Sequence, residues 1–172
     1  MRVLLFFDQI QAGAGGKEKP DVKLAVEKGG IGSYTMFERF MKEVDGNVVA
    51  TMYCGDGYFF DNEEEVKRKV TALIDKLKAD IVLCGPCFNY ENYAHMSTIL
   101  AKEIEEKTNA KAVAMLSAEN EEVINKFKDE IRIVKMPKKG GTGLNQSLHN
   151  MTKVLKAAVE EQDPSVYEKY IY

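Results

Sequence analysis

Five short apolar runs alternate along this chain with stretches in which hydrophobic and polar residues follow a helical period. The runs are nearly continuous in apolar residues, which is typical of strands that are covered on both faces of a sheet. We therefore predict five mainly parallel strands in the interior of the protein. They span residues 3–7, 48–52, 81–84, 112–116 and 131–134.

Helices are expected between these strands. The clearest spans residues 62–78, where Asp61 and Glu64 indicate a capping box and the apolar residues share one face. The other predicted helices span residues 34–44, 93–107, 121–128 and 144–158. Strands that alternate with helices form βαβ units with right-handed crossovers. The predicted fold class is α/β: an open, doubly wound, mainly parallel five-stranded sheet with helices on both faces, flavodoxin-like or Rossmann-like. We favour the flavodoxin-like strand order.

The 172 residues are expected to form a single α/β domain, residues 1–162, and a C-terminal tail, residues 163–172. The tail carries three tyrosines, whose side chains could pack either on this domain or on a partner protein. The first connection, residues 8–32, is much longer than the ~2–6 residues usual in compact α/β domains. Connections of this length are either functional or disordered, and both interpretations stay open here.

Composition and net charge indicate which partners and which compartment to expect for this protein. Hydrophobic residues make up 45% of the chain and charged residues 30%, and the formal net charge is −3. An acidic chain of this kind does not have the charge expected of a nucleic-acid-binding protein, so we expect no nucleic-acid partner. The three cysteines form no disulfide-scaffold pattern, no signal peptide is recognisable, and no apolar run approaches the ~20 residues of a membrane helix. We therefore expect a cytoplasmic protein that does not associate with membranes.

Two short segments that each follow a predicted strand carry most of the chemistry in this sequence. One reads C-G-D-G-Y-F-F from Cys54, with glycines that suggest a tight turn, and the other reads C-G-P-C-F-N from Cys84. Ligands of open parallel sheets bind outside the carboxyl ends of the strands, so we expect both segments to face one crevice. The candidate substrate-binding residues are Asp8, Asp56, Tyr58, Asn89 and Tyr93.

The cysteines are the candidate catalytic residues. Cys84 and Cys87 have the C-x-x-C spacing of redox proteins, and the thiolate of a cysteine at a helix N-terminus is stabilised. The surrounding sequence departs from that of thioredoxins, so thiol chemistry and a packing role both stay open. Cys54 is either a third reactive thiol or a small buried hydrophobic residue at a strand end. Because only Cys54, His95 and His149 remain as further cysteine or histidine ligands, we expect no metal site and no cofactor.

Four pieces of the sequence, taken together and in order, resemble a known family. They are F-D-Q-I-Q-A-G-A-G-G-K-E-K-P-D-V, K-G-G-I-G, C-G-D-G-Y-F, and G-P-C-F-N with Tyr93 shortly after it. This set is similar to the N-terminal region of the selenoprotein B subunit of the glycine/betaine/sarcosine/D-proline reductase family. The family pattern reads approximately G-G-E-E-K, C-G-D-N-Y-F and G-P-A-F-N. The resemblance covers about residues 1–160.

The resemblance implies a component of an anaerobic reductase that acts on amino-acid-type substrates. In that family an amine substrate is held as a Schiff base on a pyruvoyl group of a partner subunit. A selenocysteine of protein B attacks the carbon that bears the amino group, and the C–N bond is cleaved. This sequence ends at Tyr172 without a selenocysteine-bearing half, and Cys87 stands where the family pattern has alanine. We therefore expect an oxidoreductase subunit that is not complete alone.

Three functional hypotheses follow. The first is a stand-alone, protein-B-like component of such a reductase. It would bind an amino-acid-type substrate or a partner subunit during reductive C–N bond cleavage, with other reductase subunits as partners, and it could also form a homo-oligomer. The second is a thiol–disulfide redox protein that uses Cys84 and Cys87. The third is a non-catalytic assembly module.

Overall fold

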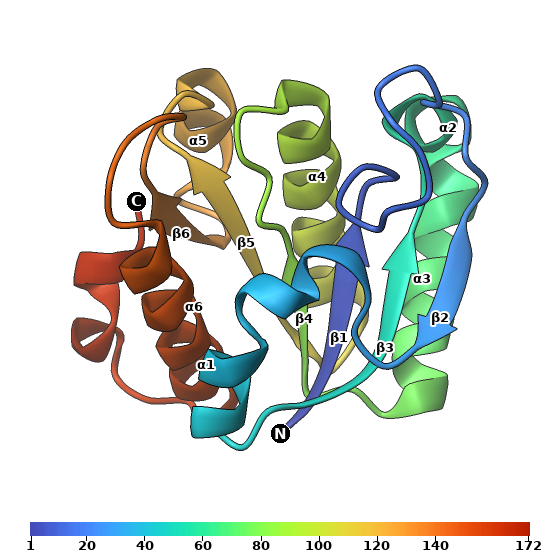
Figure 1. The fold of residues 1–172 in the computed structure, drawn as a ribbon. Coiled ribbons are helices and arrows are strands. Elements are labelled where there is room, and N and C mark those ends of the chain that lie inside the picture. Colours follow the sequence, from blue (N-terminus) through green and yellow to red (C-terminus); the bar gives the residue numbers. More distant parts are fainter.

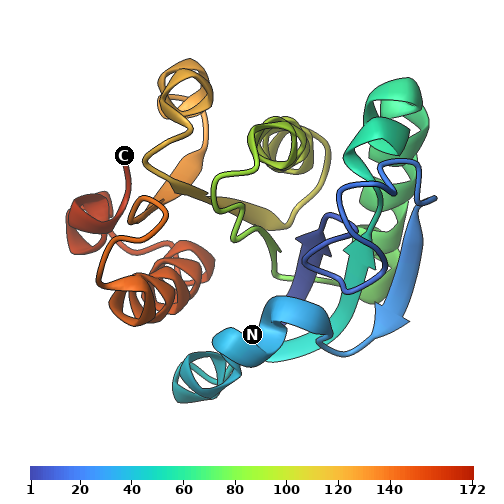
Figure 2. The ribbon, with the colours of Figure 1, turned by 45° about the horizontal axis from the view of Figure 1, so that its top comes forward.

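A computed structural model describes residues 1–172 and contains a single six-stranded sheet with helices on both faces (Figures 1 and 2). The strand order is β2-β3-β1-β4-β5-β6. The strands are β1 (Arg2–Phe7), β2 (Ala25–Lys28), β3 (Asn47–Tyr53), β4 (Ile81–Cys84), β5 (Lys111–Ser117) and β6 (Arg132–Met136).

The five predicted strands correspond to β1, β3, β4, β5 and β6, and all of them pair in parallel. Among themselves they follow the flavodoxin-like order, in which the second strand of the chain lies on one side of the first and the remaining three on the other. The predicted α/β class and the open sheet are therefore confirmed.

The prediction of five strands was one too few. The long first connection contributes β2, which pairs antiparallel with β3 at the edge of the sheet. Its four residues, Ala-Val-Glu-Lys, are mostly exposed, because an edge strand outside the helical layers needs no continuous apolar run. The connection leads into a 3₁₀ turn, η1 (Gly32–Met36), and its own strand β2 shows that it is structured.

The helices are α1 (Glu38–Glu43), α2 (Asp56–Asp61), α3 (Glu63–Leu77), α4 (Glu91–Lys107), α5 (Glu121–Phe127) and α6 (Leu144–Val159). All five predicted helices are present. Four differ from the prediction by small shifts at their ends, and the one predicted for residues 34–44 is shorter because residues 32–36 form η1. The segment after Cys54 was expected to turn tightly but forms α2 instead. The predicted capping box was wrong as well: Asn62 lies at the junction of α2 and α3, and its side-chain amide donates to the Tyr58 carbonyl at 3.0 Å.

Alternate residues of β1 enter two separate hydrophobic clusters. Leu4 and Phe6 pack with α3, α4 and α5 on one face of the sheet, while Val3, Leu5 and Phe7 pack with α1 and α6 on the other. Figure 2 shows these two helical layers. A strand covered on both faces has no polar side, which explains the continuous apolar run in the sequence.

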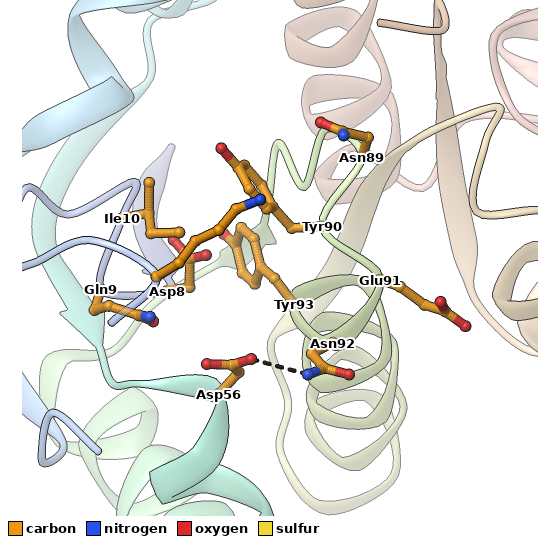
Figure 3. A pocket seen from close by; sticks show the side chains of 10 residues that line it. Asp8, Gln9, Ile10, Asp56, Asn89, Tyr90, Glu91, Asn92 and Tyr93 are labelled. Atoms are coloured by element: carbon orange, nitrogen blue, oxygen red, sulfur yellow. Dashed lines mark hydrogen bonds between the residues drawn. The ribbon is translucent and has the colours of Figure 1, made fainter. Parts of the chain in front are cut away.

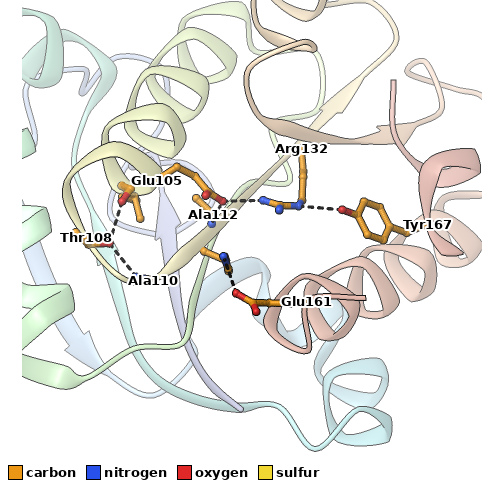
Figure 4. Close-up of polar contacts among 9 residues, drawn as sticks. Glu105, Thr108, Ala110, Ala112, Arg132, Glu161 and Tyr167 are labelled. Carbon is orange, nitrogen blue, oxygen red and sulfur yellow. Dashed lines mark hydrogen bonds and ion pairs between the residues drawn. The ribbon is translucent and has the colours of Figure 1, made fainter. Parts of the chain in front are cut away.

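The C-terminal tail packs on this domain. It forms two 3₁₀ turns, η2 (Pro164–Val166) and η3 (Glu168–Tyr170), and Tyr167 between them is buried against α6. The Arg132 guanidinium pairs with Glu105 at 2.7 Å and donates to the Tyr167 hydroxyl at 3.4 Å (Figure 4). The Tyr172 hydroxyl donates to the Leu116 carbonyl at 3.1 Å. Of the two interpretations of the tail, these contacts favour packing on the domain itself.

None of the helices combines the length and the apolar character that a membrane span requires.

Candidate functional site

A cavity of about 370 Å³ lies at the carboxyl ends of β1, β3 and β4 (Figure 3). The direction of strand succession reverses between the neighbouring strands β1 and β4, and such a switch point is where open α/β sheets usually bind ligands. The ten residues that line the cavity are Asp8, Gln9, Ile10, Lys17, Asp56, Asn89, Tyr90, Glu91, Asn92 and Tyr93. The long first connection therefore supplies one wall of the site.

Asp8 is the first residue after β1 and is only 3% exposed. One of its carboxylate oxygens accepts a hydrogen bond from the backbone N–H of Gln11 at 2.7 Å. Burial raises the pKa of the Asp8 carboxyl from 3.8 to about 6. The Asp56 carboxylate adds to this rise, and the backbone N–H donors oppose it. A carboxyl group that titrates near neutrality in a cavity is a candidate for ligand binding.

Asp56 begins α2 and faces the same cavity from the end of β3. The side-chain amide of Asn92, in the first turn of α4, donates to the Asp56 carboxylate at 3.1 Å, as Figure 3 shows. This bond links α2 to α4 at the carboxyl ends of the strands. The cavity is thus lined by three acidic residues, Asp8, Asp56 and Glu91. Lys17, whose ammonium lies 5.0 Å from the ring centre of Tyr90, is the one basic residue that lines it.

The structure brings four of the five predicted substrate-binding residues to this cavity, and it does not bring Tyr58. The Tyr58 side chain packs against the core cluster of α3 and α4 instead, because α2 replaces the expected turn. Tyr93 lines the cavity, but its hydroxyl donates to the Phe6 carbonyl at 2.7 Å, which leaves its ring to serve as a wall. Asn89 is exposed at the rim.

The five predicted substrate-binding residues do not include six others that line the cavity, which are Gln9, Ile10, Lys17, Tyr90, Glu91 and Asn92. Gln9 directly follows Asp8 at the carboxyl end of β1, so its position in the chain was a usable signal. Asn92 lies one helical residue before Tyr93 and is likewise close to a residue that was predicted. Lys17 lies in the glycine-rich first connection, whose lysines could contact an anion, but its position at this cavity depends on the folding of that connection.

The three cysteines are all buried and unbonded to one another, and none of them lines this cavity. Burial raises the pKa of the Cys54 and Cys84 thiols to about 12, and it raises the pKa of Cys87 well above its ordinary value. The Cys87 thiol donates to the Ser97 hydroxyl at 3.2 Å. This environment disfavours thiolates. The catalytic role of the cysteines stays a prediction that the geometry does not support.

We expect all three thiols of the native protein to react slowly with iodoacetamide. The rate should be roughly 100-fold or more below that of the unfolded chain, because both the thiolate and its access to reagent require local opening. Mass spectrometry of time points would measure each site. Fast modification of Cys84 or Cys87 while the protein remains folded would contradict the structure and restore the thiol–disulfide hypothesis.

No group of three or more histidine, cysteine, aspartate or glutamate side chains is arranged to hold a metal ion. The side chains that line the cavity offer three carboxyl groups, one ammonium, amides and tyrosine rings.

Comparison with known proteins gives one family. The family model described as glycine/sarcosine/betaine reductase selenoprotein B matches residues 1–172. A glycine reductase complex component B subunit gamma from Symbiobacterium thermophilum is 32% identical over 120 residues, which is 70% of this chain and 28% of that protein. No solved structure matches.

Two further relatives come from Peptoclostridium acidaminophilum. A sarcosine reductase complex component B subunit beta is 26% identical over 99% of this chain and 39% of its own length. A betaine reductase complex component B subunit beta is 24% identical over 91% of this chain and 34% of its own length. The chain thus spans between about a quarter and two fifths of the length of these curated relatives.

Proposed function

Because this chain belongs to the glycine/sarcosine/betaine reductase selenoprotein B family, we propose that it is a component of such a reductase complex. In this proposal it works with other reductase subunits in the reductive cleavage of a C–N bond. The names of the relatives support this role, since all three are component B subunits of reductase complexes.

The part we assign to this chain is the binding of a small amino-acid-type substrate. The observation that carries the assignment is that Asp8 and Asp56 line one cavity at the switch point of the sheet. Two carboxyl groups favour a cationic ligand group such as a substrate ammonium. Lys17 at the same cavity offers a positive charge for a substrate carboxylate. A zwitterion with both groups on one carbon chain matches this distribution of charge.

Saturable binding is the first expected result. Titration of the labelled protein with glycine, sarcosine and betaine, followed by amide NMR spectra, should shift signals of residues 8–10 and 89–93 for at least one of them. Asp56→Asn should weaken that binding by roughly 10-fold, because it removes a charge-assisted contact. Asp61→Asn removes the same charge from an exposed position outside the cavity and should leave the affinity unchanged.

Assembly is tested separately. The tagged chain, expressed in a host that carries a glycine, sarcosine or betaine reductase, should co-purify with subunits of that complex. Absence of both co-purification and ligand binding would remove the proposed function. Co-purification without ligand binding would leave an assembly role and withdraw the assignment of the cavity.

A further inference from the structure

Gln9 carries an unsatisfied oxygen in the wall of this cavity. Its side chain is 2% exposed, and its Oε1 is the one buried side-chain nitrogen or oxygen atom in the protein without a hydrogen-bond partner. An acceptor that is buried without a donor destabilises the folded state, so native proteins rarely retain one without a reason. Gln9 lines the cavity, and Figure 3 shows its amide on the side of the Asp8 and Asp56 carboxyl groups.

The hydrogen bond of the amide nitrogen sets the orientation of the Gln9 side chain. Nε2 of Gln9 donates to the Gly16 carbonyl at 3.3 Å. Rotating the amide by 180° would place Oε1 against that carbonyl, and two acceptors would then face each other. Nε2 therefore stays on Gly16, and the oxygen is the atom that lacks a donor.

The neighbouring groups do not supply the missing donor. Asp8 accepts hydrogen bonds, and its own carboxylate lies in the same wall. Asn92 has an amide N–H at the cavity, but it donates to Asp56. The wall formed by residues 8 and 9 therefore has a surplus of acceptors, and a ligand that fills it must bring N–H or O–H donors.

We propose that Gln9 and Asp8 together select ligands by the N–H bonds of their ammonium group, so that the cavity takes primary and secondary amines in preference to quaternary ones. This inference rests on the proposed substrate-binding function and specifies its substrate class. A primary or secondary ammonium has at least two N–H bonds and can serve both acceptors at once. A quaternary ammonium carries the same charge but has no N–H, so it places methyl groups against two desolvated oxygens.

We expect a large difference in affinity between ligands that differ only in the number of methyl groups on the nitrogen. A site built to receive a hydrogen bond rejects an analogue that lacks the donor more strongly than an apolar pocket rejects an extra methyl group, because its own polar atoms are left unpaired. Charge cannot provide this discrimination here, since glycine and its N-methyl derivatives all carry one ammonium and one carboxylate near neutral pH. The number of N–H bonds is the property that changes most sharply along the series.

The test is a titration with glycine, sarcosine, N,N-dimethylglycine and betaine, which carry three, two, one and no N–H bonds. Affinity should be similar for the first two and should then fall by roughly 5–10-fold at each of the last two steps, as each acceptor in turn loses its donor. Gln9→Met, which has a similar shape and no strong acceptor, should weaken glycine and sarcosine binding and leave betaine nearly unaffected.

Gln11→Met is the matched control. Gln11 belongs to the same connection and is also buried, but its side-chain oxygen accepts from the Ser33 hydroxyl and it does not line the cavity. This variant should keep the full dependence on N–H bonds. If Gln9→Met does not fold, the side-chain amide signal of Gln9 in the wild type replaces it, with an expected shift on glycine but not on betaine binding.

The outcomes separate the two proposals. Binding of all four ligands with equal affinity overturns the selection by N–H bonds and leaves the proposed function standing. Gln9→Met should lose one of the two affinity steps and keep the other, which Asp8 provides. Two undiminished steps in Gln9→Met overturn the role of Gln9. Binding of none of the four overturns the substrate-binding function itself, and a water molecule then remains as the partner of the Gln9 oxygen.

Discussion

Asp8→Asn is expected to stabilise the folded protein at neutral pH by about 1–3 kcal/mol. Burial raises the pKa of Asp8 from 3.8 to about 6. The folded state therefore binds a proton more tightly than the unfolded state, and the ionised carboxylate costs stability above pH 6. As the pH falls from about 6 to 4, the wild type recovers this stability by protonation. Urea unfolding at pH 7.5 and pH 4 should show a gain from Asp8→Asn that disappears at the lower pH.

The same substitution should weaken the binding of an amine ligand by roughly 10–100-fold, because it replaces a charge-assisted contact in a desolvated site by a neutral one. Wild-type affinity should also fall as the pH drops through 6, and the affinity of Asp8→Asn should not. A substitution that raises stability while it removes binding is the signature of a residue kept for function. Lower stability of Asp8→Asn at pH 7.5 would mean that the carboxylate is held by hydrogen bonds that outweigh its burial.

Asp61→Asn is the control for both effects. Asp61 lies at the end of α2 and is exposed, so its neutralisation changes the net charge equally without changing a buried group. We expect its unfolding free energy to stay within about 0.5 kcal/mol of the wild type. An equal gain from Asp61→Asn would attribute the effect to net charge rather than to the cavity.

The parallel strands could be predicted because burial on both faces imposes a continuous apolar run, as in residues 3–7. β2 lacked that signal: it has one exposed valine, and its pairing with β3 depends on the path of the preceding loop. α2 was missed because Gly55 and Gly57 are typical turn residues, whereas in the fold Gly55 precedes the helix and Gly57 lies within it. Local propensity was overridden by tertiary contacts at both places.

The part of the site that lies directly after the carboxyl ends of strands could be predicted from the sequence. Asp8 and Asp56 each come directly after a strand or its corner, and the topology rule places such residues together. The burial of the three thiols could not be read from the C-x-x-C spacing, which is compatible with an exposed or a buried pair. The unsatisfied oxygen of Gln9 also has no sequence signal, since it arises from the contact of its amide with Gly16.

Gly55→Ala should destabilise the protein by about 2–3 kcal/mol and weaken ligand binding, because it forces residues 20–22 away from the corner that carries Asp56. A Cβ at Gly55 would lie 2.0 Å from the Pro20 carbonyl oxygen and 2.9 Å from the Val22 nitrogen. Those segments are joined by hydrogen bonds from the Gly55 N–H to the Val22 carbonyl at 2.8 Å and from the Tyr58 N–H to the Pro20 carbonyl at 2.8 Å. Thermal and urea unfolding would measure the loss.

The cause is steric, because Gly55 has φ −67°, which any residue can adopt. Gly57→Ala separates this cause from a general effect of alanine in α2. A Cβ at Gly57 would lie 3.0 Å from the Pro20 oxygen, a tight contact that a small shift relieves, and alanine favours the helix by up to about 1 kcal/mol. We expect Gly57→Ala to be near neutral. An equal loss of unfolding free energy in both variants would show that the corner after β3 tolerates no side chain at all. An unchanged unfolding free energy in Gly55→Ala would mean that residues 20–22 can move away freely. In that second case, the first connection would not hold Asp56 in place at the cavity.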